Sequence, residues 1–205
     1  MIEAFLKSLS LSAVRRIAGA SSRWIGPEPS ANQRIYCANH TSHLDAALLL
    51  AALPTRLANQ TRPVAAADYW GTGRLRRYLT EDVFRSVMIQ RESKELNPLS
   101  PVFQALRQGD SLIFFPEGTR GPGGFLQPLK PGIYSLARAF PKVEIVPVWI
   151  QNSSRVLPKR AKLPIPESCT LLFGESLKIN DNEDAPAFLL RLGKAMDTLR
   201  QQAAQ

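Results

Sequence analysis

The chain has 205 residues, enough for one α/β domain with a substantial core but cramped for two. Its formal net charge of +9 and sequence pI near 10.0 favour an anionic partner, and charge alone does not choose among nucleic acid, lipid headgroups and phosphorylated substrates. No apolar run approaches the roughly 20 residues that span a bilayer. No Cys/His group has metal-ligand spacing. The two cysteines, Cys37 and Cys169, lie in apolar stretches, which argues against a disulfide framework and favours a reducing compartment.

The first residues of the chain have the pattern of an amphipathic helix. Acidic Glu3 and the pair Arg15 and Arg16 fit poorly with a signal peptide. We expect residues 1–28 to form a segment that associates with a membrane through this helix, its basic residues turned toward lipid phosphates; packing on the rest of the chain is the alternative. The apolar positions at helical spacing are Ile2, Phe5, Leu6, Leu9, Ala13 and Ile17.

Residues 29–205 alternate between short β-rich runs and helical patterns. The β-rich runs are 34–38, 63–67, 86–90, 111–115, 143–150 and 169–173, and the helical patterns are 42–53, 96–108, 131–140 and 185–202. Several runs are apolar on both faces, as in strands that helices cover from both sides. The pattern predicts a single α/β domain with a central, mostly parallel mixed sheet flanked by helices.

The two histidines of the chain, His40 and His43, lie between the first predicted strand and the helix after it. If the helix starts near Ser42, the loop residue His40 can meet Asp45 in the first helical turn, and a carboxylate on one imidazole nitrogen leaves the other free to accept a proton. Alternatively, Ser42 is a helix N-cap, Asp45 favours the positive end of the helix, and His40 is an ordinary loop residue. His43 is interpreted as structural.

A second polar turn follows the apolar run that ends at Phe115. Glu117, Gly118, Thr119 and Arg120 stand directly after this predicted strand, where ligands bind in α/β sheets. Glycine allows a close backbone approach, and an arginine can hold a phosphate through two parallel hydrogen bonds. The alternative is a surface turn with a local Glu117–Arg120 ion pair.

Together, the two segments resemble the first and third signature blocks of the glycerolipid acyltransferase family, which includes the 1-acylglycerol-3-phosphate acyltransferases. The first block is Asn39-His40-x-Ser42-x-x-Asp45, and the third is Phe115-Pro116-Glu117-Gly118-Thr119-Arg120. The run Phe84–Arg91 resembles the second block, Val146-Pro147-Val148 the fourth, and Lys130-Pro131-Gly132 fits the basic residue and glycine that follow the third. The second block lacks the glycine often found before its arginine, and the fourth lacks its following glycine.

The resemblance implies a glycerolipid acyltransferase-type fold for residues 29–205 and direct acyl transfer without a covalent enzyme intermediate. His40 would act as general base and Asp45 would orient it. Arg91, Arg120 and Lys130 would hold the acceptor phosphate, with Glu117, Gly118 and Thr119 shaping that pocket. The implied acceptor is a lysophospholipid such as 1-acylglycerol-3-phosphate, the co-substrate is acyl-CoA or acyl carrier protein, and no metal or other cofactor is expected.

Other interpretations remain open at this point. The acceptor can be another lysolipid, a glycolipid or an aminoacyl lipid, and the chain can be a non-catalytic lipid-binding module; a nucleic-acid binder rests on charge alone, and we expect no nucleic-acid partner. We expect a cytoplasmic protein, peripheral on the anionic inner face of the cell membrane. Two basic clusters are interpreted either as solvated faces or as contacts for lipid, coenzyme A or carrier protein: Arg74, Arg76 and Arg77 after Tyr69-Trp70, and Arg155, Lys159, Arg160 and Lys162.

Overall fold

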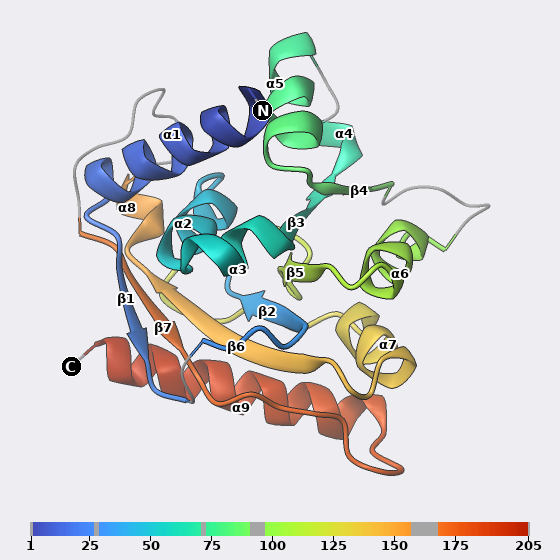
Figure 1. The fold of residues 1–205 in the computed structure, drawn as a ribbon. Coiled ribbons are helices and arrows are strands. Elements are labelled where there is room, and N and C mark those ends of the chain that lie inside the picture. The colour runs from blue at the N-terminus through green and yellow to red at the C-terminus, as the bar shows by residue number, and fades with distance from the viewer. Residues whose placement is uncertain (1, 27–28, 71–72, 91–96, 157–167, 205) are drawn as a thin grey trace.

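The computed structural model describes residues 2–26, 29–70, 73–90, 97–156 and 168–204, in which seven strands form one sheet (Figure 1). The strand order is β1-β7-β6-β2-β5-β3-β4, and every neighbouring pair is parallel except β6 and β7. The prediction of an α/β domain with a mostly parallel mixed sheet is therefore confirmed. The strands are β1 (Ser21–Trp24), β2 (Arg34–Ala38), β3 (Thr61–Ala66), β4 (Val87–Ile89), β5 (Ser111–Phe114), β6 (Glu144–Gln151) and β7 (Thr170–Phe173).

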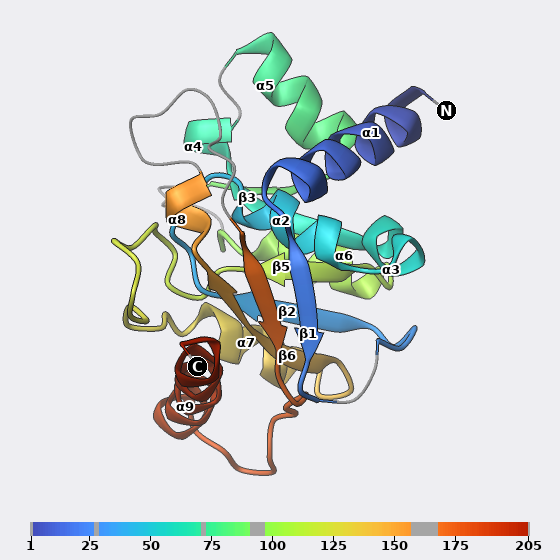
Figure 2. The ribbon, with the colours of Figure 1, turned by 90° about the vertical axis from the view of Figure 1, so that its left-hand side faces the viewer.

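Helices cover both faces of this sheet (Figures 1 and 2). On one face lie α2 and α3, with α1 packed outside α2; on the other lie α6, α7 and α9. Among the described residues the helices are α1 (Ile2–Ile17), α2 (Asp45–Ala52), α3 (Thr55–Gln60), α4 (Ala67–Trp70), α5 (Arg74–Tyr78), a π-helical turn η1 (Leu79–Val83), α6 (Ser100–Arg107), α7 (Gly132–Ala139), α8 (Ser153–Val156) and α9 (Ala185–Ala203).

Strand β2 separates two apolar cores because successive side chains of a strand point to opposite faces. Tyr36 and Ala38 pack into the core under α2, and Ile35 and Cys37 pack into the core under α6, α7 and α9. All four are buried. The central strand thus reads as an unbroken apolar run, and its carboxyl end delivers the next residues to the edge of the sheet where α2 begins.

All six predicted strands and all four helices predicted after residue 29 are confirmed, β2 with the predicted bounds and the others with shifted ends. The largest shift that bears on the site is at α2, which begins at Asp45 instead of Ser42. Strand β1 was not predicted from the sequence. Its four residues are polar except for Trp24 and are mostly exposed at the sheet edge, so they show no apolar alternation; pairing with β7 and the stacking of Trp24 on Phe173, with ring centroids 4.0 Å apart, hold them in the sheet.

Helix α1 is fastened to the domain by two basic side chains. Lys7 Nζ donates to the Ala58 carbonyl at 2.8 Å, and the Arg15 guanidinium donates to the Ala51 carbonyl. Both carbonyls lie near helix C-termini, where C=O groups lack intrahelical partners and the helix dipole favours cations. Lys7 is therefore buried against α3. The expectation that the basic residues of this helix face outward does not hold for Lys7.

The outward face of α1 carries apolar side chains. Ile2, Phe5 and Leu9 are 69%, 67% and 57% exposed, whereas Val14 packs against the core. No helix of the described residues has the length and apolar character needed to cross a bilayer.

Candidate active site

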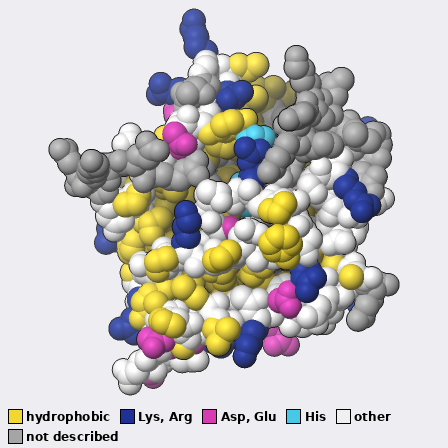
Figure 3. Space-filling model, turned by 180° about the vertical axis from the view of Figure 1, so that it is seen from behind, with side chains coloured by type: hydrophobic (Ala, Val, Ile, Leu, Met, Phe, Trp, Pro, Cys, Tyr) yellow, Lys and Arg dark blue, Asp and Glu magenta, His cyan; other side chains and the backbone are white. Residues whose placement is uncertain are grey.

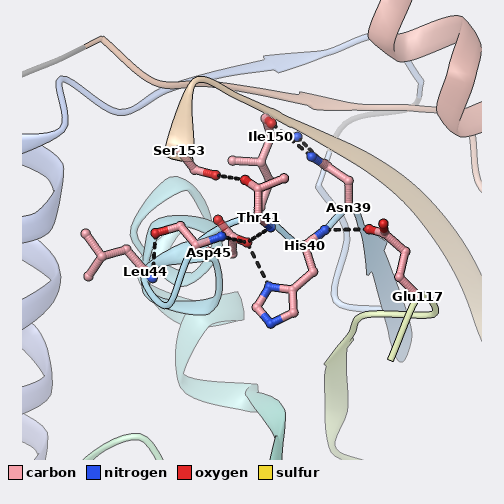
Figure 4. A network of polar contacts seen from close by, with 9 residues as sticks. Asn39, His40, Thr41, Leu44, Asp45, Glu117, Ile150 and Ser153 are labelled. Carbon is pink, nitrogen blue, oxygen red and sulfur yellow. Dashed lines mark hydrogen bonds and ion pairs between the residues drawn. The ribbon is translucent and has the colours of Figure 1, made fainter. Parts of the chain in front are cut away.

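Three groups of the loop between β2 and α2 contact one carboxylate oxygen of Asp45 (Figure 4). Its Oδ2 accepts hydrogen bonds from the backbone N–H groups of Thr41 and Ser42 at 2.7 and 2.8 Å, and lies 2.8 Å from His40 Nδ1. These bonds satisfy amides that precede the helix, and α2 begins at Asp45 itself. Ser42 does not cap the helix; its hydroxyl accepts from the Leu44 N–H instead.

The contact with Asp45 defines how the imidazole of His40 is presented. Asp45 is fully buried, while the His40 side chain remains 22% exposed. An ionised Asp45 favours the tautomer with the proton on Nδ1, which leaves Nε2 as a proton acceptor pointing away from the carboxylate (Figure 4). Phe115 stacks on the imidazole with a centroid distance of 4.1 Å and restricts its rotation. The sequence-predicted pair His40 and Asp45 is thus brought together.

Strand β6 braces the same loop from the other side. The Asn39 side chain donates to the Ile150 carbonyl at 3.1 Å and accepts from the Ile150 N–H at 2.7 Å, so one amide side chain replaces a backbone pairing. The Thr41 and Ser153 hydroxyl groups lie 2.7 Å apart. Asn39 and Thr41 were not predicted as site residues; the signal for Asn39 was its place beside His40 in the first block.

Glu117 holds the backbone of the site instead of facing the cavity. Its Oε1 accepts from the His40 N–H at 2.6 Å and its Oε2 accepts from the Gln127 N–H at 3.0 Å, and the residue is only 3% exposed. Burial raises the pKa of this carboxyl group, and the two backbone hydrogen bonds oppose that shift. Glu117 was expected to shape the substrate pocket directly, but it is not among the residues that line the cavity; it acts on the site through the His40 backbone.

A cavity of about 990 Å³ opens next to His40. Its wall is mostly apolar, with Val14 of α1, Leu50 of α2, Val64 of β3 and Ile89 of β4 among its lining residues. Of the charged side chains that line it, Asp68 is acidic and Arg120 and Lys130 are basic. A long apolar ligand therefore fits the interior, with a polar or anionic group near the histidine.

The turn after β5 brings the remaining predicted residues to this cavity. Gly118, Thr119, Arg120 and Lys130 all line it. Gly118 has a φ of 71°, which favours glycine, and a Cβ atom there would lie 2.9 Å from the flexible end of the Lys130 side chain and would displace it. The predicted phosphate ligand Arg91 lies outside the described residues.

His43 lies in an aromatic cluster at the cavity. Its ring stacks on Tyr69 with centroids 4.5 Å apart and meets Trp70 edge-on at 5.6 Å. Burial, followed by the positive charge of Arg120, lowers the pKa of His43 to about 4. His43 is therefore neutral near pH 7. Among the described residues, no group of three or more His, Cys, Asp or Glu side chains is arranged to hold a metal ion.

The chain is similar to a known family and to individual proteins of it. The sequence model of the family described as Acyltransferase matches residues 23–151. A 1-acyl-sn-glycerol-3-phosphate acyltransferase of Chlamydomonas reinhardtii is 28% identical over 158 residues, which is 73% of this chain and 44% of that protein. A chloroplastic 1-acyl-sn-glycerol-3-phosphate acyltransferase of Brassica napus is 34% identical over 71 residues, which is 32% of this chain and 20% of that protein. The chain thus spans less than half the length of either relative.

A solved structure has the same fold. The crystal structure of the 1-acyl-sn-glycerophosphate acyltransferase of Thermotoga maritima matches with a TM-score of 0.74, covering 97% of this chain and 82% of that one at 18% identity.

Proposed function

The chain belongs to the Acyltransferase family, and from that premise we propose that it is an O-acyltransferase that moves a fatty acyl group from acyl-CoA or acyl carrier protein to a lysophospholipid hydroxyl. The proposed acceptor is 1-acylglycerol-3-phosphate and the product phosphatidic acid. The observation that carries this proposal is the 2.8 Å contact of His40 Nδ1 with buried Asp45 beside a mostly apolar cavity of about 990 Å³.

In the proposed reaction His40 acts as general base. Its Nε2 takes the proton of the acceptor hydroxyl while that oxygen attacks the thioester carbonyl, and Asp45 stabilises the imidazolium that forms. The carbon–sulfur bond of the tetrahedral intermediate then breaks. The leaving thiolate takes the proton back from the imidazolium, and because an unperturbed thiol has a pKa of about 8.5, it needs little help to leave.

The charges at the cavity support a phosphate-bearing acceptor. Arg120 and Lys130 line the same cavity as His40, so a phosphate held by them lies in the cavity that the base faces. Arg91 is proposed as a further phosphate ligand from its motif alone. The apolar wall supports a fatty acyl chain as the second part of the substrate.

We also propose that the protein acts as a peripheral protein on an anionic membrane surface, the cytoplasmic inner face of the cell membrane. The exposed apolar face of α1 and the net charge of +9 support this proposal.

The test is an acyl-transfer assay with radiolabelled acyl-CoA and 1-acylglycerol-3-phosphate in mixed micelles, run beside His40→Ala. We expect phosphatidic acid from the natural sequence and a loss of at least about 10²-fold in the variant, as is typical when a general base is removed. If neither makes product, acyl carrier protein as donor and a panel of lysolipids, glycolipids and aminoacyl lipids follow. Failure with every pair, with lipid binding retained, would replace the enzyme by a lipid-binding module.

A further inference from the structure

The two arginines Arg76 and Arg120 come from distant parts of the chain and meet at one aromatic ring. The guanidinium carbon of Arg76, in α5, lies 4.8 Å from the centroid of the Tyr69 ring, and that of Arg120, after β5, lies 5.8 Å from the same centroid. Arg76 Nη1 also donates to the Tyr69 backbone carbonyl at 3.5 Å. Tyr69 and Arg120 line the cavity, and Arg76 lies beside them through its contact with Tyr69; we call this edge of the cavity the rim.

The ring of Tyr69 is itself held in place. His43 stacks on it with a 14° angle between the planes, and Trp70 meets it edge-on at 5.2 Å. Cation–π contacts of this kind stabilise a guanidinium without neutralising it, in contrast to an ion pair. The α5 helix shows that contrast, because its neighbouring Arg77 pairs with Glu81 at 3.1 Å.

Two like charges that share one ring raise the positive potential at that point of the rim. The positive charges of Arg120 and Arg76 both lower the pKa of His43, in keeping with their common contact with the Tyr69 ring on which His43 stacks. Asp68, Arg120 and Lys130 line the cavity, and Arg76 adds a further positive charge beside Tyr69, so the basic side chains outnumber the acidic one there. Figure 3 shows cationic side chains beside a histidine among hydrophobic side chains on this face.

We propose that Arg76, held on the Tyr69 ring together with Arg120, completes a subsite for a phosphomonoester at the rim of the cavity. A phosphomonoester near pH 7 carries close to two negative charges, and two guanidinium groups match that charge and its acceptor oxygens. Tyr69 is a positioning residue that acts through the two arginines.

The inference rests on the proposed function, because it takes the cavity as the substrate site. Two substrates of that reaction carry a phosphomonoester: the lysophosphatidate headgroup and the 3′-phosphate of coenzyme A. The chemistry is shared, and the source is decided by which ligand loses affinity when Arg76 is changed.

The experiment is calorimetric binding in the His40→Ala background, which binds without turnover. The probes are 1-oleoylglycerol 3-phosphate against 1-oleoylglycerol in neutral micelles, and coenzyme A against its 3′-dephospho form. We expect Arg76→Gln to weaken the binding of one phosphate-bearing probe about tenfold and to leave the binding of its phosphate-free partner unchanged. A tenfold change is at the lower end of the range for a hydrogen bond to a charged group, because the rim is exposed to solvent. Arg77→Gln is the matched control from the same helix.

Two Tyr69 variants separate positioning from folding. Tyr69→Leu should reproduce the loss, and Tyr69→Phe, which keeps the ring, should restore affinity. In the transfer assay, Arg76→Gln should raise the KM of the same substrate about tenfold while kcat changes less than about twofold. Equal affinities in Arg76→Gln and Arg77→Gln for both phosphate probes would overturn the inference.

The outcomes for the two proposals are separable. Phosphate binding that depends on Arg76, in a protein that transfers no acyl group, overturns the proposed function and leaves the subsite standing. Acyl transfer in a protein whose phosphate binding does not depend on Arg76 overturns the subsite and leaves the proposed function standing.

Discussion

The Glu117 carboxylate accepts the backbone N–H of His40 across 2.6 Å, joining two segments that lie 77 residues apart in the chain. The His40 carbonyl in turn accepts the Gly121 N–H at 2.8 Å. The turn after β5 therefore binds both the N–H and the C=O of His40. The proposed base is therefore positioned by its main chain as well as by Asp45.

Glu117→Gln should impair catalysis more than substrate binding. One of the two acceptor oxygens becomes an NH2 group that faces a backbone donor, so a buried N–H of His40 or Gln127 loses its partner. We expect a loss of about 1–3 kcal/mol in the free energy of unfolding and a fall in kcat of at least about tenfold from the displaced imidazole. Denaturant titration and steady-state kinetics measure the two effects. The exposed Glu175→Gln serves as control, and an unchanged kcat would remove Glu117 from this role.

Protonation of His43 should destabilise the folded protein in mild acid. The pKa of His43 is lowered from 6.5 to about 4 by burial first and then by Arg120, His40 and Arg76. Between these values the unfolded chain binds a proton that the folded chain does not, so the stability is complete above pH 6.5 and is lost as the pH falls toward 4. Urea unfolding at pH 7 and pH 5 measures this loss.

His43→Phe isolates that contribution because the aromatic stack is kept and the titrating group is removed. The variant should lose less stability between the two pH values than the natural sequence does. Equal losses in both proteins would contradict the prediction.

Gly118→Ala should act on Lys130 and thereby on the acceptor. A methyl group at this position would lie 2.9 Å from the lysine side chain, in a backbone with φ of 71°. Gly124→Ala is the matched control, since Gly124 has φ of 82° and open space around the same position. Both variants should lose about 1 kcal/mol or more of stability from the backbone. Only Gly118→Ala should raise the acceptor KM several-fold; equal KM values in the two variants would separate Lys130 from the acceptor.

Lys7→Met should loosen α1 from the domain. The change keeps an unbranched side chain of similar length but removes the donor, so the Ala58 carbonyl loses its hydrogen bond from Lys7. We expect the free energy of unfolding to fall by about 1–3 kcal/mol, against less than about 0.5 kcal/mol for the exposed Arg16→Met in the same helix. Faster amide hydrogen exchange in α1 of Lys7→Met is the local measure, and identical exchange in the two variants would contradict it.

Local pattern was sufficient to predict the main elements, and together with the motif resemblance it predicted the pairing of His40 with Asp45. Strand β2 reads as an unbroken apolar run and helix α9 is long enough to show its periodicity, and five residues across a strand–turn–helix junction limit where two side chains can meet. The motif resemblance placed Gly118, Thr119, Arg120 and Lys130 at one site, and the structure brings these four to the same cavity.

Only the tertiary structure decided the contacts that join distant segments. Nothing in the order of residues indicates that Glu117 holds the His40 backbone, that Lys7 turns inward to a helix end, or that Arg76 and Arg120 share the Tyr69 ring. The physical reason is that hydrophobic periodicity specifies which face of an element is buried, whereas hydrogen bonds and cation–π contacts depend on which polar groups the packed elements leave facing one another.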